Sequence, residues 1–402
     1  IAGEEGICSG CGVATLSISY YDIGYKAGEM AYDILVNGKD ISTMDIEYAP
    51  NVTKEYNAAI CSDLGITVPD DYVAIDAELF FLTRGFFLMN YFMSLDPLAL
   101  FRSMPGAFAQ GMVWGLMALG VYITYRLLDF ADLTVDGSLA TGGAVAVMLI
   151  RGGMSPWAAL IFAFLAGMAA GFITGILHTA LGIPGILASI LTQISLYSIN
   201  LNIMGMANLA VSVDQYPLLL SSRKITASIL IALVLIAIVI SALYWYFGTE
   251  QGSAIRATGC NPAMSKAQGI NISVTKVIAL SLSNALVALS GGFMAQYQGF
   301  SDINMGRGAI VIGLAAVIIG EVIGEALLGK HLNFFGKLSF LVIGGIIYYI
   351  VVGIVLWLKL PSNDLKLFTA VIVAIFLAVP YLKGQSKSSF KKAAKKGAQH
   401  NA

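Results

Sequence analysis

The chain has 402 residues, of which 57% are hydrophobic and only 12% are charged, and its formal net charge is −1. Charged residues make up about a quarter of a typical soluble globular protein. The composition therefore excludes an ordinary soluble domain, gives no basic surface for nucleic acid, and indicates a polytopic membrane protein in a lipid bilayer. The 43 glycines suit helices that approach one another closely in lipid.

The charges are distributed unevenly along the chain. Residues 1–76 carry thirteen acidic residues against three lysines, whereas residues 77–402 carry eleven acidic residues against twenty basic ones. The first segment is therefore expected to be a soluble piece attached to a membrane domain. Because the chain begins at Ile1 and opens with no secretory signal, we expect the N-terminus to be truncated.

Cysteine and histidine give no pattern that is typical of a reactive centre. Cys8 and Cys11 form a CxxC pair, but neither a second ligand pair nor a thioredoxin-like context accompanies it. The three histidines, His178, His331 and His400, do not stand at metal-ligand spacings. The sequence therefore predicts no catalytic residue and no metal site.

Residues 14–75 show the patterns of soluble α/β structure. Residues 14–20 alternate like a strand, residues 21–36 place apolar side chains on one helical face, and Asn37-Gly38 ends that helix. Residues 44–48 are expected to form a second strand and residues 54–64 a second amphipathic helix. A stable α/β domain usually needs more than these two strands and two helices. Residues 1–76 are therefore expected to be the incomplete end of a larger domain.

This segment resembles the C-terminal end of periplasmic-type binding proteins of the aromatic amino acid class. The matching residues are Tyr20-Tyr-Asp-Ile-Gly24, Gly28-Glu-Met-Ala31, Gly38, the stretch 57–66 and Pro69. The resemblance implies that most of the family's ligand pocket would lie upstream, so this piece alone is not expected to bind substrate.

Residues 77–104 leave several interpretations open. The run is apolar and rich in phenylalanine, but Arg84 interrupts it. It suits a short membrane helix, an interfacial helix, or two neighbouring genes read as one chain, with the membrane protein starting at Met89 or Met93.

Nine apolar segments follow, and most reach the roughly 17–25 residues that a bilayer requires. The second, seventh and ninth are short and are expected to be broken or re-entrant. The segments are 105–127, 133–150, 156–177, 184–205, 225–246, 276–297, 308–323, 335–357 and 367–382. The predicted fold is an all-α polytopic membrane protein of about eight or nine transmembrane helices, preceded by a small incomplete α/β segment. The expected domains are 1–76, a linker or extra helix over 77–104, a membrane domain over 105–382, and a tail over 383–402.

The tail holds six lysines and no acidic residue, which by the positive-inside rule places it in the cytoplasm. Counting back through the spans puts residues 249–271 on the same side and residues 1–104 outside. Basic residues in the other loops do not distinguish the two sides.

The longest polar interval between apolar runs is residues 247–271. Asn261-Pro262 is a helix-start signal, so a short helix is expected over 262–268, ended by Gly269. Its small residues would let it seat closely in a groove. The alternative is an ordinary amphipathic surface loop.

Nucleotide-binding patterns are incomplete. Residues 324–330 fit GxxxxGK, but His331 stands where a P-loop needs Ser or Thr, and no buried strand precedes it. Any energy from ATP must therefore come from another chain.

Polar side chains inside spans are costly and are candidates for a translocation path, although hydrogen bonding between helices explains many of them. Glu321 has a second interpretation, at a cytoplasmic turn with Glu325. The candidates are Gln193, Asn200, Asn202, Asn284, Gln296 and Glu321.

The interval 249–271, followed by Leu289-Ser-Gly-Gly292, resembles the coupling-helix loop of ABC importer permeases that serve branched-chain amino acids and related sugars. The likeness covers about residues 105–382 and includes Asp132-Leu-Thr-Val-Asp-Gly137. In that family the loop docks in a groove of the cytoplasmic ATPase. The candidate coupling residues are Thr249, Gly252, Arg256, Gly259, Asn261, Lys266 and Gly269.

The resemblance implies a transport subunit of the cytoplasmic membrane that is not itself an enzyme. It would bind no cofactor directly and would work with an ATPase dimer that holds ATP and Mg²⁺, a second permease copy and an external binding protein. The expected cargo is an amino acid, aromatic or branched-chain, with sugars or nucleosides as the alternative. A secondary transporter would need an intramembrane charge relay, for which only Glu321 is a candidate and no basic partner within a span is expected.

Overall fold

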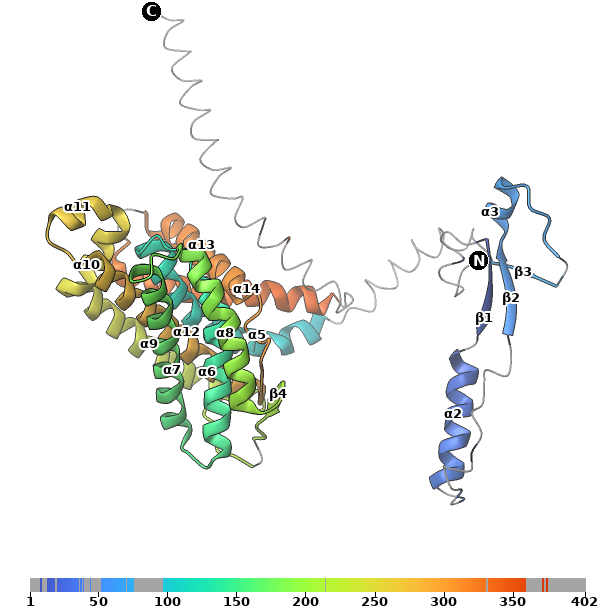
Figure 1. Ribbon diagram of the computed structural model, residues 1–402. Coiled ribbons are helices and arrows are strands. Elements are labelled where there is room, and N and C mark those ends of the chain that lie inside the picture. The colour runs from blue at the N-terminus through green and yellow to red at the C-terminus, as the bar shows by residue number, and fades with distance from the viewer. Residues whose placement is uncertain are drawn as a thin grey trace, which may run out of the picture. The chain divides into compact units, whose positions relative to one another are not determined.

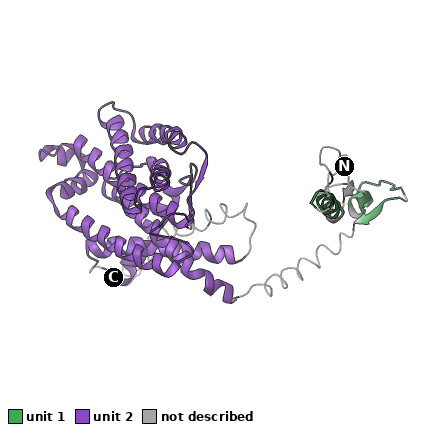
Figure 2. Ribbon diagram, turned by 90° about the horizontal axis from the view of Figure 1, so that it is seen from below, with its two compact units in different colours: residues 1–96 green, residues 97–402 purple. Residues whose placement is uncertain are grey.

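The computed structural model describes residues 8, 13–18, 20–35, 37, 39, 44, 52–69, 71–75, 97–213, 215–329, 332–358, 371 and 374. The chain divides into two compact units, Ile1–Asp96 and Pro97–Ala402, coloured green and purple in Figure 2. Each unit is described separately below.

In its described residues, the first unit shows a three-stranded mixed sheet and two helices. The elements are β1 (Ala14–Ile18), α2 (Tyr20–Leu35), β2 (Val52–Asn57), α3 (Ala58–Asp63) and β3 (Val73–Ile75). β2 is the central strand: it pairs antiparallel with β1, Leu16 opposite Lys54, and parallel with β3, Tyr56 opposite Ala74.

Two predictions for this unit are confirmed and one is wrong. The expected first strand and first helix correspond to β1 and α2. The helix expected over 54–64 is wrong, because Lys54–Asn57 belong to β2 and only α3 is helical. The Asn57 side chain accepts a hydrogen bond from the Ile60 backbone N–H at 3.2 Å, so it caps α3 and fixes the strand-to-helix change there. Most of the strand expected at 44–48 lies outside the described residues, as does Cys11.

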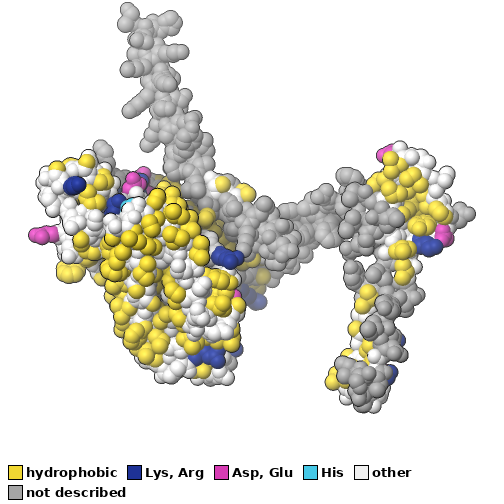
Figure 3. Space-filling model, in the orientation of Figure 1, with side chains coloured by type: hydrophobic (Ala, Val, Ile, Leu, Met, Phe, Trp, Pro, Cys, Tyr) yellow, Lys and Arg dark blue, Asp and Glu magenta, His cyan; other side chains and the backbone are white. Residues whose placement is uncertain are grey.

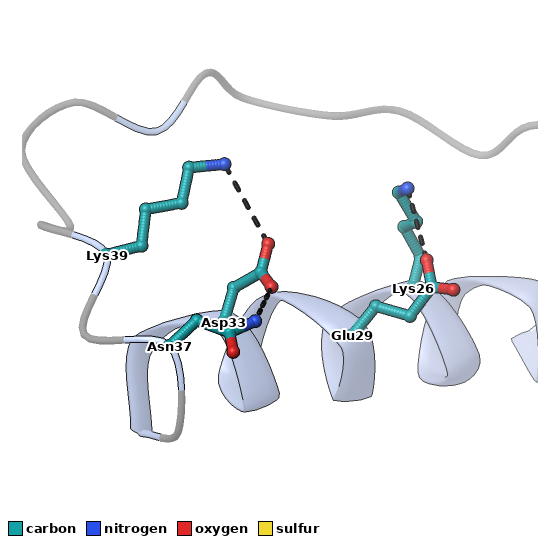
Figure 4. A network of polar contacts seen from close by, with 5 residues as sticks. All are labelled: Lys26, Glu29, Asp33, Asn37 and Lys39. Carbon is teal, nitrogen blue, oxygen red and sulfur yellow. Dashed lines mark hydrogen bonds and ion pairs between the residues drawn. The ribbon is translucent and has the colours of Figure 1, made fainter.

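Helix α2 carries a row of polar contacts on its surface (Figure 4). Lys26 Nζ lies 3.2 Å from Glu29 Oε2, one turn along the helix. Near the C-terminal end of α2, Asp33 accepts from Asn37 Nδ2 at 2.8 Å and lies 3.8 Å from Lys39 Nζ. These pairs are solvent-exposed, so each contributes little to stability, about 0–1 kcal/mol.

The second unit is a bundle of long helices (Figure 1). Among its described residues, seven helical segments are long and apolar enough to cross a membrane by length and composition, and α6 adds a further, largely buried helix. The helices are α5 (Pro97–Tyr122) with the π-helical turn η2 (Ile123–Leu127), α6 (Thr134–Arg151), α7 (Pro156–Thr179), α8 (Gly185–Met204), α9 (Ile225–Gly248), α10 (Glu250–Cys260), α11 (Pro262–Ala267), α12 (Ile272–Gln298), α13 (Ala309–Leu328) and α14 (Phe334–Trp357). The chain is a polytopic α-helical membrane protein, as its composition predicts.

The second segment is not broken, because α6 is one continuous helix. The helix boundaries differ most from the predicted ones at two places. The first span does not start at Pro105: α5 begins at Pro97 and continues through Pro105, which lies inside the helix. The seventh segment is not short, because α13 has 20 residues and contains both Glu321 and Glu325 within the helix. The expected ninth span, the lysine-rich tail and the run 77–96 lie outside the described residues, apart from positions 371 and 374.

Helix α12 lies at the centre of the bundle, packed against α5, α6 and α7. Two of its serines donate hydrogen bonds to carbonyls of α5: Ser283 to Gly120 at 2.8 Å and Ser290 to Val113 at 2.7 Å. Glycines on the neighbouring helices allow the backbones to touch. A Cβ on Gly142 of α6 would lie 1.8 Å from the Ala288 carbonyl oxygen of α12, closer than any side chain tolerates.

The outside of the bundle is apolar. Figure 3 shows a broad band of hydrophobic side chains on one flank of the helical unit. On α9, Trp245 and Leu230 are among the most exposed large side chains, at 73% and 61% of their surface. Such a surface suits hydrocarbon rather than water.

The bundle has two ends, which are named here by the elements found there. At one end α10 and α11 precede the start of α12; at the other, β4 (Asn208–Ala210) pairs antiparallel with β5 (Phe300–Asp302), just after α12 finishes. α12 therefore runs from the α10–α11 end to the β4–β5 end.

We expect Gly142→Ala to destabilise the bundle by about 1–3 kcal/mol, because the added methyl group would overlap the α12 backbone. The measurement is the thermal unfolding midpoint of the purified protein in detergent. Gly248→Ala is the matched control, since a Cβ there meets nothing within 4 Å. Equal midpoints for both variants would contradict the packing described.

Candidate functional site

The polar interval between α9 and α12 folds as two consecutive short helices. Thr249 caps α10: its hydroxyl accepts from the Gly252 N–H at 3.4 Å and donates to the Tyr246 carbonyl at 2.6 Å. Asn261 caps α11 in the same way, accepting from the Met264 N–H at 3.0 Å, with Pro262 at the first helical position. The short helix expected near 262–268 is confirmed, and Gly269 follows it with φ +83°.

Helix α10 packs against the long helices of the second unit rather than projecting from them. Ile255 and Thr258 are buried at 1% exposure each. A Cβ on Gly259 would lie 2.0 Å from the Leu127 carbonyl oxygen of η2, and one on Gly252 would lie 2.4 Å from Phe247 Cα. These two glycines let α10 lie directly on η2 and on the end of α9.

The Arg256 side chain also contacts the long helices of the bundle. Its Nη2 donates to the Phe247 carbonyl at 3.0 Å, and its guanidinium carbon lies 5.9 Å from the ring centre of Phe334 on α14. A planar guanidinium suits a carbonyl on one side and an aromatic face on the other. Arg256 therefore ties α10 to α9 and α14.

Helix α11 presents the free surface of this pair. Only Ser265 of its six residues is buried, and Met264 is 58% exposed. Among the seven candidate coupling residues, Thr249 and Asn261 are caps, and Gly252, Arg256 and Gly259 contact the rest of the bundle. Four of the seven lie exposed: Arg256, Asn261, Lys266 and Gly269. Sequence analysis did not single out Met264, although it is a large apolar residue in an otherwise polar, small-residue interval.

An ion pair lies at the same end of the bundle. Arg126 Nε of η2 donates to Glu321 Oε1 of α13 at 3.0 Å, with the carboxylate side chain 22% exposed. The two residues line a small cavity of about 220 Å³ together with Glu325 and Lys337. The expectation that Glu321 has no basic partner within a span is wrong, because η2 continues the α5 span and carries Arg126.

Asn284 belongs to a buried hydrogen-bond network. It donates from Nδ2 to Asp132 Oδ2 at 2.7 Å and accepts from Ser138 Oγ at 2.6 Å. Asp132 also accepts from the Thr134 N–H at 2.9 Å, at the start of α6. All of these groups are buried and paired, so the network fixes where α6 begins against α12.

The remaining path candidates lie in three different places. Gln193 and Asn200 of α8 line one cavity of about 290 Å³, together with Asp136 and Arg307. Asn202 is exposed and donates to the Ser198 carbonyl of its own helix at 3.0 Å. Gln296 accepts from the Leu219 N–H at 3.1 Å and so holds the segment before α9. Of the six candidates, the structure brings only Gln193 and Asn200 together.

The described residues contain no group of three or more His, Cys, Asp or Glu side chains that could hold a metal ion. The segment Gly324–Leu328, which begins the GxxxxGK pattern, lies inside α13 rather than after a strand. The arrangement therefore offers polar cavities and a short helix pair on an apolar bundle, features that suit a membrane transport protein.

Comparison with known families agrees with that class. The family described as "Branched-chain amino acid transport system / permease component" matches residues 104–380. The chain belongs to this family, and it is a transport subunit that moves a small polar solute.

Individual proteins show the same likeness. The tyrosine transport system permease protein of Clostridioides difficile is 39% identical over 269 residues, which is 67% of this chain and 88% of that protein. The autoinducer 2 import system permease protein LsrC of Yersinia pestis is 28% identical over 263 residues, 64% of this chain and 71% of that protein. Among solved structures, PsaBC from Streptococcus pneumoniae in complex with Fab has a TM-score of 0.31 and 14% identity, covering 66% of this chain and 95% of that one.

We expect Gly259→Val to loosen α10 from η2, because the new side chain would overlap the Leu127 carbonyl. Amide hydrogen exchange of residues 250–260 should then rise strongly relative to that of α12. Cys260→Val is the control, because this substitution introduces the same valine side chain one position along, at a residue that is exposed. Unchanged exchange in Gly259→Val would contradict the seating of α10.

Proposed function

We propose that this chain is the membrane-spanning subunit of an ATP-binding-cassette importer, and that the α10–α11 pair is where a cytoplasmic ATPase docks. The observation that carries the proposal is the division of labour in this pair. Close-packed glycines and Arg256 hold α10 on the bundle, while α11 stands exposed with Met264 and Lys266 on its surface. An exposed short helix on a rigid base suits insertion into a partner's groove.

Contacts of the α10–α11 pair connect it to the long helices of the bundle. The Gly259–Leu127 contact places α10 on η2, and the Arg126–Glu321 pair joins η2 to α13. A partner that moves α11 would therefore act on α5 and α13 through packed groups. In this proposal the ATPase dimer supplies ATP hydrolysis, a second permease copy completes the membrane part, the α10–α11 end faces the cytoplasm, and a binding protein delivers cargo at the β4–β5 end.

The proposed cargo is an amino acid with an aromatic or branched side chain. The name of the relative from C. difficile, a tyrosine transport system permease protein at 39% identity, supports this choice, as does the family description. The first unit, with its mixed sheet and α2, would be a remnant of a binding protein of the same kind of system. The Arg126–Glu321 pair lies at one end of the bundle, so it offers no relay across the membrane for an ATP-independent transporter.

Met264→Glu and Lys266→Glu together should lower co-purification with the ATPase by tenfold or more. The two substitutions replace an apolar and a basic side chain on the exposed face of α11 with two carboxylates. A tenfold loss corresponds to about 1.4 kcal/mol of binding free energy. The measurement is the amount of ATPase retained on the tagged permease in detergent. Met206→Glu is the control: Met206 is 52% exposed, immediately before β4 at the opposite end.

Undiminished ATPase retention by the α11 variant would contradict the docking assignment. Equal loss in Met206→Glu would show a general effect of the added charge rather than an effect on docking.

Reconstituted vesicles should take up L-tyrosine only when the ATPase, the binding protein and ATP are all present. Uptake of radiolabelled L-tyrosine, L-leucine and D-ribose is compared in the same vesicles. Accumulation of ribose but neither amino acid would contradict the proposed cargo, and accumulation without ATP would contradict the importer class.

A further inference from the structure

A cavity of about 290 Å³ lies between α6, α8 and the segment that leads into α13. Its wall includes Asp136, Gln193, Asn200, Ile303 and Arg307. Small-molecule sites in proteins begin at about 300 Å³, so the space suits a small ligand or one end of a larger one.

Asn200 is the unusual member of this wall. It is 1% exposed, and neither its Oδ1 nor its Nδ2 has a hydrogen-bond partner among the described residues. An amide buried without partners is costly in water-soluble proteins and more so in a membrane. Asn284, by contrast, sits in a span with both ends of its amide paired. Asn200 therefore lines the cavity with an amide whose donor group and acceptor are both still without a described partner.

The two charged residues of the wall are in different situations. Both oxygens of Asp136 already accept backbone hydrogen bonds, from Gly308 at 3.0 Å and from Ile310 at 2.9 Å, so this carboxylate holds the start of α13. Arg307 directly precedes Gly308, and no acidic side chain in the described part of the chain pairs with its guanidinium. The cavity wall thus has an exposed guanidinium with no described acidic partner, near a carboxylate whose two oxygens already accept hydrogen bonds.

The wall is held firmly by close backbone contacts. A Cβ on Gly306 would lie 1.9 Å from the Asp136 carbonyl oxygen, and one on Gly137 would lie 3.2 Å from Gln193 Cα. The Arg307 segment and α8 are therefore fixed against the same turn of α6. Groups held in this way are arranged before a ligand arrives, which lowers the entropic cost of binding.

We propose that this cavity binds the carboxylate and ammonium groups of the transported α-amino acid. Arg307 and the Asn200 Nδ2 donate to the carboxylate, while the Asn200 Oδ1 and the Gln193 side chain accept from the ammonium group. The inference rests on the importer function proposed above and adds the residues that recognise the cargo. An uncharged sugar would leave the Arg307 guanidinium unpaired, so the site favours an amino acid over a sugar.

The cargo's side chain would extend toward the open side of α8. Ile194 and Tyr197 also line the cavity, and they are 63% and 41% exposed. An apolar or aromatic side chain can lie against them while the polar end stays at Asn200. The site therefore selects the backbone of the amino acid and leaves its side chain less restricted.

The first test is uptake of radiolabelled L-tyrosine by the full importer in vesicles, with loaded binding protein at saturation. Asn200→Leu keeps the branched shape of the side chain, adds some volume and removes both polar atoms of the amide; Arg307→Gln removes the charge. Each should lower uptake by about tenfold or more while the ATPase still co-purifies, and Arg307→Lys should retain part of it. Ser195→Ala, on the exposed face of the same helix, should take up L-tyrosine at the wild-type rate.

The second test measures binding without transport. Ile194→Cys is placed in a chain whose four native cysteines are replaced by serine, and its alkylation rate is followed in detergent. L-tyrosine should slow alkylation and D-ribose should not, and adding Arg307→Gln should abolish the protection by L-tyrosine.

Uptake by Asn200→Leu and Arg307→Gln within twofold of wild type would overturn the site while leaving the importer function standing. So would alkylation at Ile194→Cys that L-tyrosine does not slow. If the wild-type importer assembles with its ATPase but carries ribose and not L-tyrosine, both the proposed cargo and this site are wrong.

Discussion

The close approach of α12 to its neighbours is the constraint on which the rest of the structure depends. Helices in lipid gain little from leaving water, so they associate through van der Waals contact and interhelical hydrogen bonds. Gly142, Gly167 and Gly171 let α6 and α7 reach the α12 backbone, where an added Cβ would lie 1.8 to 2.3 Å from a carbonyl oxygen. Larger residues at these positions would separate the helices and remove the contacts that hold α12 in place.

Because α12 is fixed along its length, it joins the two ends of the bundle as a stiff element. It starts at the Asn271 cap, a few residues after α11, and ends at Gly299 before β5. The segment that carries Arg307 follows β5 directly. The exposed helix pair and the wall of the α8 cavity are therefore attached to opposite ends of one helix. Close-packed helices move as rigid bodies rather than bending, so displacement at one end is felt at the other.

Composition and local patterns predict much of this fold. Apolar run lengths locate the spans, and Asn261-Pro262 with Gly269 locates α11, because caps and breakers act within a few residues. Boundaries set by distant packing are harder: α5 extends back to Pro97, and Lys54–Asn57 become a strand because they pair with β1 and β3.

The contacts of the candidate sites are even harder to predict from the sequence than the helix boundaries. The motif 249–271 marks α10 and α11 but does not reveal that Gly259 lies on Leu127, or that Arg256 contacts Phe247 and Phe334. Arg307 lies outside the predicted spans, and its relation to Asn200 depends on how α6, α8 and α13 meet. No spacing along the chain encodes that meeting, so sequence analysis could propose Asn200 and could not propose Arg307.

The buried amides of the bundle show how structure separates similar polar residues. Asn284 has partners for its donor and its acceptor, Gln296 has one for its acceptor alone, and Asn200 has none among the described residues. A fully paired amide adds to packing, whereas an unpaired one costs about 1–3 kcal/mol. A stable bundle can tolerate this cost if a ligand or a water molecule pairs with the amide while the protein works. Asn200 also borders the cavity that Arg307 lines, so the same small volume brings together a buried amide without a described partner and a guanidinium without a described acidic partner. A single carboxylate can accept hydrogen bonds from both.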